Sequence, residues 1–321
     1  MIPATAHFIW IGTEFPWLNY AAIASALANG GFSRVVLHHT HDLSGATWWR
    51  ALARHPAVER RRIIPEEVLR RVGCHGLVEL YRELSAPAAL TNMLRLTVLL
   101  EEGGVYLDLD TVTARSLSAL REASFFCGAE RIAFPASLER TRNPARWGAA
   151  FLRTGVRDVA RRSAHGVHWF RKLEHLYPAA ANNAVIGAER GHPFLAELLR
   201  RVASMPRKHA LQRYALGTSL LQHALGEIDS NALVVHAPEV FYPLGPELSQ
   251  HWFRLNCRAR LDDVLRPATR VVHWYASVRT RHLIPEITPL WVERNRDRQL
   301  LSALLFNALE KEFRSVGEPS A

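Results

Sequence analysis

Two aspartates, one residue apart, directly follow a glycine pair and an apolar segment. Asp108 and Asp110 end the sequence Gly-Gly-Val-Tyr-Leu-Asp-Leu-Asp, which begins at Gly103. Side chains at positions i and i+2 of a strand point to the same face, so we expect Tyr106 and both acids on one face. Paired carboxylates attract a hard divalent cation, and Mg²⁺ and Mn²⁺ prefer such oxygen ligands. The segment therefore predicts a metal clamp at the end of a buried strand.

A bare pair of aspartates is common in solvated turns, but the preceding residues favour a functional site. Residues 86–102 have apolar side chains at helical spacing, and Gly103 is suited to end that helix in a left-handed conformation. A strand follows at once, with the acids at its carboxyl end. Open α/β sheets bind their ligands at that end of their strands. This order of elements indicates metal-assisted chemistry.

The first forty residues predict a parallel sheet. Residues 6–12 form an apolar run, residues 16–29 have helical spacing, and residues 34–39 form a second apolar run. Strand, helix and strand at this spacing make a right-handed βαβ unit. Further strands are expected at 125–127, 131–134, 184–187, 234–237 and 270–274, and helices at 45–55, 65–72, 76–84, 193–205, 217–225 and 291–316. Residues 135–146 are expected to form a loop, and residues 147–177 a helical or irregular insertion.

Composition excludes several classes of protein. With 48% hydrophobic and 22% charged residues, the chain of 321 residues is expected to be globular. Because the sequence shows no internal repeat and no linker, we predict one α/β domain over residues 1–321. No apolar run reaches the ~18 residues of a membrane-spanning helix, and the N-terminus has no signal-like segment. We expect a cytoplasmic protein, unless a non-classical system exports it. The three cysteines form no C-x-x-C pair, which argues against a disulfide framework or zinc.

The net charge of +10 comes almost entirely from arginine. Such a surplus attracts nucleotides, phospholipid surfaces, lipopolysaccharide or nucleic acid. An arginine-rich codon bias explains part of it equally well. Because we find neither a DNA-binding motif nor aromatic residues interleaved with basic ones, we predict no nucleic-acid partner.

Four segments, in the same order along the chain, resemble one family of glycosyltransferases. Residues 89–112 closely resemble its sugar-binding region containing D-x-D. The family includes yeast outer-chain mannosyltransferases, α-1,4-galactosyltransferases, bacterial capsular and lipopolysaccharide transferases, and clostridial glucosylating toxins. Residues 2–12 resemble its opening strand, residues 182–194 its middle motif, and residues 273–277 its C-terminal H-x-x-x-S motif. The family's usual Trp after that Ser is Val278 here.

The resemblance implies a GT-A fold, which is a Rossmann-like, mostly parallel sheet flanked by helices, with helical insertions. Residues 1–135 would form the nucleotide-sugar half, and residues 136–321 would hold the acceptor site and the C-terminal motif. The resemblance implies three metal ligands, Asp108, Asp110 and His273. It implies that the catalytic residues are Asp108, Asp110, Arg95 and Asn183. The implied donor-binding residues are Ile9, Trp10, Asn92, Arg95, Tyr106, Asp108 and Ser277. Trp10 would stack on the nucleotide base.

Asn92 departs from the family pattern, which usually has Asp at this position. Asp accepts hydrogen bonds from hydroxyls of the donor sugar, whereas Asn has one acceptor oxygen, one NH₂ donor and no charge. The identity of the sugar stays open for this reason.

The resemblance implies a metal-dependent hexosyltransferase that uses Mn²⁺ or Mg²⁺. A UDP-sugar is the favoured donor, with GDP-mannose open, and the acceptor is a hydroxyl of a glycan, a lipid-linked sugar or lipopolysaccharide. Members of the family are generally retaining, so the resemblance implies retention. Because no second carboxylate stands at a nucleophile position, we expect front-face attack by the acceptor hydroxyl. The positive charge suits peripheral contact with an anionic membrane surface. Two alternatives stay open: an effector that glycosylates protein, and a nucleotide-sugar-binding module without activity. A nucleic-acid-binding protein with an incidental D-x-D is a third alternative, which we rank last.

Overall fold

The computed structural model of the protein describes residues 1–135, 138, 141–212, 214–228, 232–276 and 280–317. Its centre is a seven-stranded sheet in the order β3-β2-β1-β4-β7-β6-β8. The strands are β1 (Thr5–Trp10), β2 (Arg34–His39), β3 (Val58–Arg62), β4 (Gly104–Leu107), β6 (Phe125–Arg131), β7 (Ala179–Ala188) and β8 (Leu233–His236). Strand β7 is antiparallel to both of its neighbours, and the other four pairings are parallel. The prediction of an α/β fold with a mostly parallel sheet is confirmed.

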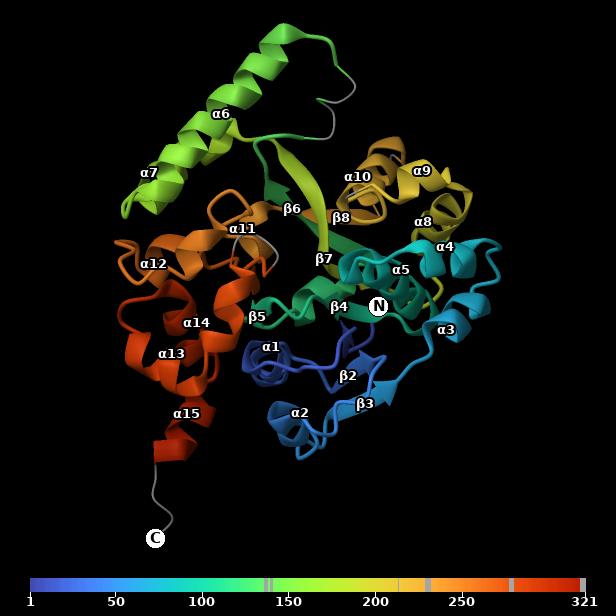
Figure 1. Ribbon diagram of the computed structural model, residues 1–321, viewed down its shortest axis with the longest axis horizontal. Coiled ribbons are helices and arrows are strands. Elements are labelled where there is room, and N and C mark those ends of the chain that lie inside the picture. Colours follow the sequence, from blue (N-terminus) through green and yellow to red (C-terminus); the bar gives the residue numbers. More distant parts are fainter. Residues whose placement is uncertain (136–137, 139–140, 213, 229–231, 277–279, 318–321) are drawn as a thin grey trace.

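Helices cover both faces of this sheet (Figure 1). One face packs against α3 (Pro65–Arg71), α4 (Leu77–Glu83), α5 (Pro87–Glu102), α8 (Pro193–Ser204) and α10 (Thr218–Glu227). The other face packs against α1 (Trp17–Asn29) and α2 (Thr47–Leu52). The C-terminal helices α12 (Leu261–Val264), α13 (Pro289–Asn295) and α14 (Leu300–Ala308) share a core with the outer side of α1, and α15 (Glu310–Gly317) follows them. Short helices complete the chain: α9 (Arg207–Ala210), α11 (Pro238–Phe241), η1 (Ser118–Glu122), η3 (Glu174–Leu176), η4 (Ser249–Trp252) and η5 (Arg281–Glu286).

The first βαβ unit is formed as expected. Strands β1 and β2 pair in parallel from Thr5↔Arg34 to Trp10↔His39, with α1 between them in the chain. Strand β1 also pairs in parallel with β4, where His7 lies opposite Tyr106. The carboxyl ends of β1, β2 and β4 therefore meet at one edge of the sheet, as in other parallel sheets that bind ligands there.

The glycine pair turns the chain from α5 into β4 within two residues. Gly103 has φ 67° and ψ −171°, so it is not left-handed helical as expected but lies in a region that only glycine populates readily. Gly104 also has a positive φ, 106°. A Cβ at Gly104 would lie 2.6 Å from the Thr5 carbonyl oxygen of the neighbouring strand. This close approach explains why a glycine stands at the first position of β4.

Two of the expected elements differ in the structure. The predicted helix over residues 291–316 is three helices, because the backbone leaves the helical conformation at Gln299 (φ −134°, ψ 127°) and again at Leu309 (φ −118°, ψ 26°). The Gln299 side chain donates to the Phe253 carbonyl (2.8 Å) and accepts from the Trp291 indole (3.1 Å). The expected strand at 131–134 ends at Arg131, since the Ala133 N–H donates to the Glu247 carboxylate (2.6 Å). Two strands escaped prediction: β3, which is rich in arginine, and β5 (Thr111–Thr113), which is very short.

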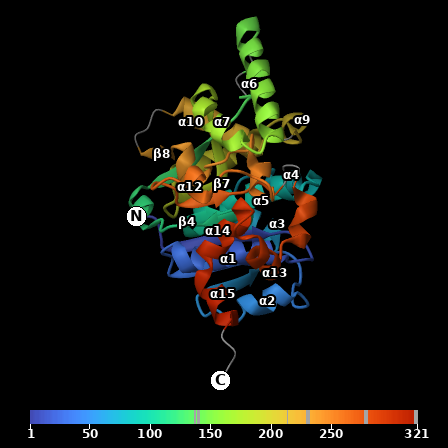
Figure 2. The same cartoon turned by 90° about the vertical axis from the view of Figure 1, so that its left-hand side faces the viewer.

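The expected insertion at residues 147–177 is helical. It consists mainly of α6 (Pro144–Arg162) and α7 (Gly166–Leu173), and α6 extends beyond the rest of the molecule (Figure 2). In the described part of the chain, no helix combines the length and the apolar character needed to cross a bilayer.

Candidate active site

The two aspartates lie at the carboxyl end of β4, as predicted. Asp108 directly follows the strand, and its N–H donates to the Ala184 carbonyl at 2.9 Å. Tyr106 packs in one hydrophobic core, while Val105 and Leu107 pack in the other on the opposite face. The expected alternation of the strand is therefore present, and it directs the acids away from the core beneath α1.

A small second sheet brings His273 to the aspartates. Strand β5 pairs in antiparallel fashion with β9 (Val271–His273), and the register places Thr111 opposite His273. The His273 Nε2 lies 2.9 Å from an Asp110 carboxylate oxygen. Ligand atoms of Asp108, Asp110 and His273 all lie within 4.8 Å of one another. Residues more than 160 positions apart in the chain thus form one cluster.

This cluster suits a divalent cation. Two carboxylates and one imidazole form a donor set that Mn²⁺ and related metals accept. His273 is buried, and its Nδ1 has no hydrogen-bond partner among the described residues. The two carboxylates are partly accessible, with side chains 23% and 17% exposed, so a ligand can reach them. Asp108, Asp110 and His273 are therefore suited in chemistry and accessibility to bind a divalent metal ion.

Burial and charge act differently on the two acids. Burial raises the pKa of Asp108, although the Arg95 guanidinium opposes this shift. At Asp110 burial acts in the same direction, but the His273 imidazole and the Ala276 N–H outweigh it, so the pKa of Asp110 is lowered. Burial also opposes the charged form of His273, yet the Asp110 carboxylate dominates and raises its pKa. Each of these two groups therefore favours the charged form of the other when no cation is bound.

Arg95 and Tyr106 hold Asp108 in place. The Arg95 Nη2 lies 3.0 Å from an Asp108 carboxylate oxygen, and the Tyr106 hydroxyl donates to the same oxygen at 2.7 Å. The Arg95 guanidinium stacks 4.4 Å above the Tyr106 ring and also donates to the Asn183 carbonyl. Arg95 is only 3% exposed, so it acts here as an internal cation beside the first aspartate.

Asn92 and Asn183 form a second polar pair next to Arg95. The Asn183 Nδ2 donates to the Asn92 Oδ1 at 2.9 Å. Asn183 lies where the β6–β7 register shifts between Cys127 and Gly128, and such bulges often re-aim side chains beside active sites. A Cβ at Gly217 would lie 2.7 Å from the Asn92 Nδ2, so the backbone before α10 closes over this pair.

A buried pair behind His273 escaped sequence analysis. Tyr275 has φ 58°, a conformation uncommon for a tyrosine, and its hydroxyl donates to the buried Glu130 carboxylate at 2.7 Å. In this loop the Trp274 N–H donates to the Asp110 carbonyl (3.0 Å), and the Ala276 N–H donates to its carboxylate (2.8 Å). The Tyr275 and His273 rings lie 4.0 Å apart. No sequence motif marks this pair, because a backbone conformation and a distant acid create it.

Comparison with known proteins agrees with this site. Residues 71–126 match the family model described as the glycosyltransferase sugar-binding region containing the DXD motif. This part of the chain is therefore similar to the sugar-binding region of DXD glycosyltransferases. The match includes α5, β4 and both aspartates, and it confirms the predicted resemblance and the prediction of a glycosyltransferase. No curated protein matches the chain in sequence.

Several solved glycosyltransferases resemble the chain in structure at low sequence identity. The PaToxG glycosyltransferase is 16% identical, with 70% of this chain and 68% of that chain covered and a TM-score of 0.46. Mouse xyloside xylosyltransferase 1 is 12% identical, with 85% and 98% covered and a TM-score of 0.47. The galactosyltransferase LgtC, in complex with donor and acceptor sugar analogues, is 13% identical, with 97% and 99% covered and a TM-score of 0.42.

Two of the remaining predicted donor-binding residues, Ile9 and Trp10, lie at the end of β1. Trp10 is partly exposed at the end of β1, with its indole edge against Phe15, whereas the Ile9 side chain is buried in the core. Ser277 lies outside the described residues. The structure therefore groups Arg95, Tyr106 and both aspartates with His273, while Asn92 and Asn183 join them through Arg95.

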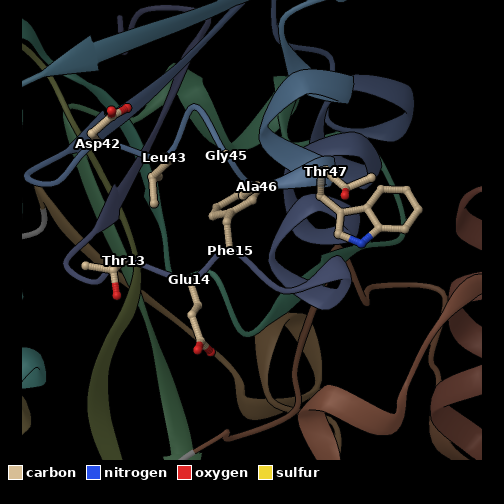
Figure 3. Close-up of a pocket in the computed structure, with 9 residues that line it drawn as sticks. Thr13, Glu14, Phe15, Asp42, Leu43, Gly45, Ala46 and Thr47 are labelled. Carbon is tan, nitrogen blue, oxygen red and sulfur yellow. The ribbon is translucent and has the colours of Figure 1, made fainter.

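A cavity of about 500 Å³ opens beside the end of β1. Thr13, Glu14 and Phe15 from the loop after β1 line one side, and residues 42–43 and 45–48 after β2 line the other (Figure 3). The size falls within the range of ligand sites. Neither aspartate of the metal cluster lines this cavity, so a ligand that used both would extend along the carboxyl edge of the sheet.

Proposed function

We propose that the protein is a metal-dependent hexosyltransferase that uses a nucleotide sugar, with a UDP-sugar as the favoured donor. The observation that carries the proposal is the cluster of Asp108, Asp110 and His273 within a matched sugar-binding region. The pairing of β5 with β9 brings the His273 imidazole, more than 160 residues away in sequence, to the two aspartates. This favours a functional site over an acidic pair without a role. Mn²⁺ or Mg²⁺ is the proposed ion, because both accept carboxylate and water oxygens.

The donor is proposed to lie along the carboxyl edge of the sheet. The cavity beside β1 accommodates the nucleoside, and Glu14 and Asp42 provide acceptors for ribose hydroxyls. Trp10 packs against Phe15 of the cavity lining. The diphosphate then reaches the Asp108–Asp110–His273 cluster. The sugar lies toward Asn92 and Asn183, whose amide groups offer both donors and acceptors to hydroxyls.

The side chains of the site are arranged for departure of a diphosphate. A divalent cation bound there supplies Lewis-acid neutralisation of the negative charge that develops on the leaving phosphate. Arg95 and Tyr106 fix the Asp108 carboxylate, and the Ala276 N–H with His273 fixes that of Asp110. Because these partners are already in place, the carboxylates need no reorganisation during transfer. Retention by front-face attack is part of the proposal, and the anomeric configuration of the product tests it.

A donor screen with metal tests the proposal. UDP plus Mn²⁺ should raise the melting temperature, since a ligand that binds only the native state stabilises it. The Asp108→Asn and Asp110→Asn variants should lose this shift, whereas Asp297→Asn, whose side chain is 89% exposed, should keep it. A shift with GDP and none with UDP would assign the donor to GDP-mannose. The absence of any nucleotide-dependent shift would refute the proposal.

The acceptor is the open part of the proposal. We favour a hydroxyl of a glycan, a lipid-linked sugar or lipopolysaccharide, and a cytoplasmic location. Labelled donor offered to lipid-linked acceptors and to a protein lysate separates this activity from protein glycosylation. Binding of a UDP-sugar without hydrolysis or transfer would instead indicate a nucleotide-sugar-binding module.

A further inference from the structure

Helix α6 exposes its apolar side to solvent. Gly148, Leu152, Gly155 and Val159 follow at intervals of three or four residues, so they lie along one face, and all four are exposed. Leu152 is 72% exposed and Val159 is 58% exposed. We call these four residues the α6 stripe. A surface helix normally places such a stripe against the core, so its exposure here needs an explanation.

The polar side of α6 attaches the helix to the molecule. Arg157 and Arg161 reach the buried Glu247 carboxylate at 3.2 and 3.5 Å. The Tyr177 hydroxyl donates to the Arg153 carbonyl at 2.6 Å. Because the charged side is used for anchoring, the orientation of α6 is fixed with its apolar stripe outward. Figure 2 shows the helix extending past the rest of the fold.

Aromatic side chains gather at the amino end of the same helix. Phe151 is 62% exposed, and its ring lies 5.7 Å from that of Phe134 and 6.3 Å from that of Trp147. Aromatic residues favour the boundary between water and the bilayer. The exposed apolar surface therefore continues from the α6 stripe to this end of the helix.

The positive charge of the protein is concentrated in the same segment. Residues 142–177 contain eight Arg or Lys and two acidic residues, a net charge of +6 out of +10 for the whole chain. Arg142, Arg146, Arg162 and Lys172 are exposed and have no acidic partner in the ranges that the structure describes. Basic residues near an anionic membrane contribute about 1 kcal/mol each.

We propose that α6 is a docking element that lies on an anionic phospholipid surface, with its stripe in the interface and its basic residues among the headgroups. Interfacial helices combine these two properties. A second copy of the chain is disfavoured as the occupant, because two segments of charge +6 would repel each other. A folded protein partner would also need hydrogen-bonding groups at its contact, and the α6 stripe offers no polar side chain.

Vesicle co-sedimentation tests the proposal with the intact protein. The wild type should bind vesicles of phosphatidylcholine with phosphatidylglycerol, bind poorly to phosphatidylcholine alone, and dissociate as salt is raised. Leu152→Ser with Val159→Ser should weaken binding by at least about tenfold. Arg146→Ala and Arg162→Ala should each weaken it about fivefold. The matched control is Leu290→Ser, which removes a leucine that is 52% exposed on α13 and should leave binding unchanged.

Other results would overturn the proposal. They are no vesicle binding by the wild type, equal binding to both kinds of vesicle, or equal loss in the Leu290→Ser control. A dimer in light scattering that dissociates in the Leu152→Ser, Val159→Ser variant would assign the stripe to a second copy instead. Each variant should keep the wild-type melting temperature and its shift with UDP and Mn²⁺, so the outcome is separate from that of the donor proposal.

Discussion

Removing the Tyr275 hydroxyl should weaken metal binding without touching a metal ligand. Tyr275 adopts φ 58°, which costs an L-residue roughly 1–2 kcal/mol. Its hydroxyl donates to Glu130 at 2.7 Å, and a buried hydrogen bond of this kind contributes about 1–3 kcal/mol. The bond is therefore large enough to hold the strained conformation. In Tyr275→Phe the loop can relax, and the Ala276 N–H then no longer points at the Asp110 carboxylate.

The expected loss in the free energy of Mn²⁺ binding equals about one hydrogen bond to a charged group, namely the bond from the Ala276 N–H to the Asp110 carboxylate. Such a bond contributes roughly 1.5 kcal/mol, so the dissociation constant for Mn²⁺ should rise about tenfold. The kcat at saturating Mn²⁺ should stay near that of the wild type, because both carboxylates and His273 remain. Paramagnetic resonance of free Mn²⁺ measures the affinity directly, and initial rates against Mn²⁺ concentration give the kinetic counterpart.

Three further variants make this prediction specific. Glu130→Gln keeps an acceptor oxygen for the Tyr275 hydroxyl and should bind Mn²⁺ nearly normally, whereas Glu130→Ala should resemble Tyr275→Phe. Tyr242→Phe is the control, since its ring lies 5.9 Å from that of His273 but its hydroxyl bonds no carboxylate in the described chain. If Tyr242→Phe and Tyr275→Phe lowered the Mn²⁺ affinity equally, the reasoning about backbone strain would be wrong.

Three other outcomes follow from the structure. Asp108→Ala and Asp110→Ala should each lower transfer by at least about a hundredfold in an assay with labelled donor, and unchanged turnover in both would exclude a role for the metal. Gly217→Ala places a Cβ 2.7 Å from the Asn92 Nδ2, so the KM for the donor should rise more than kcat falls, and identical kinetics would show that this amide does not contact the donor. Burial lowers the pKa of His7 to about 4, so the folded state favours neutral His7 and loses stability as the pH falls from about 6.5 to about 4. In urea unfolding between pH 7.5 and pH 5, His7→Gln should lose about 2 kcal/mol less stability than the wild type, and an equal loss in both proteins would contradict the assignment.

The amino-terminal half of the sheet could be predicted because its signals are local. The βαβ unit repeats apolar side chains at strand and helix spacing, and the glycine pair marks the turn before β4. The two aspartates are close in sequence, and although β4 ends at Leu107, Leu109 still packs in the same core as Val105 and Leu107. The two acids lie together as the alternation predicts. Arg95 has apolar neighbours in the sequence, which favour a buried position, and it is 3% exposed.

The rest of the site depends on contacts between distant segments, which no local pattern specifies. His273 was predicted only through a family motif, and the pairing of β5 with β9 supplies the physical reason for its position. The bulge that presents Asn183 arises from the register of β6 on β7. The link from Tyr275 to Glu130 spans 145 residues. These three features form only when distant segments come together in the tertiary fold, so the sequence alone could not predict them.

The late position of β9 in the chain has a consequence during synthesis. The last strand of the seven-stranded sheet ends at His236, and the third proposed metal ligand is residue 273. A nascent polypeptide can thus complete its central scaffold on the ribosome while the cation site still lacks its imidazole. The proposed metal site is complete only when the segment with His273 has left the exit tunnel. Prematurely terminated chains that lack this segment are therefore expected to be inert toward the donor.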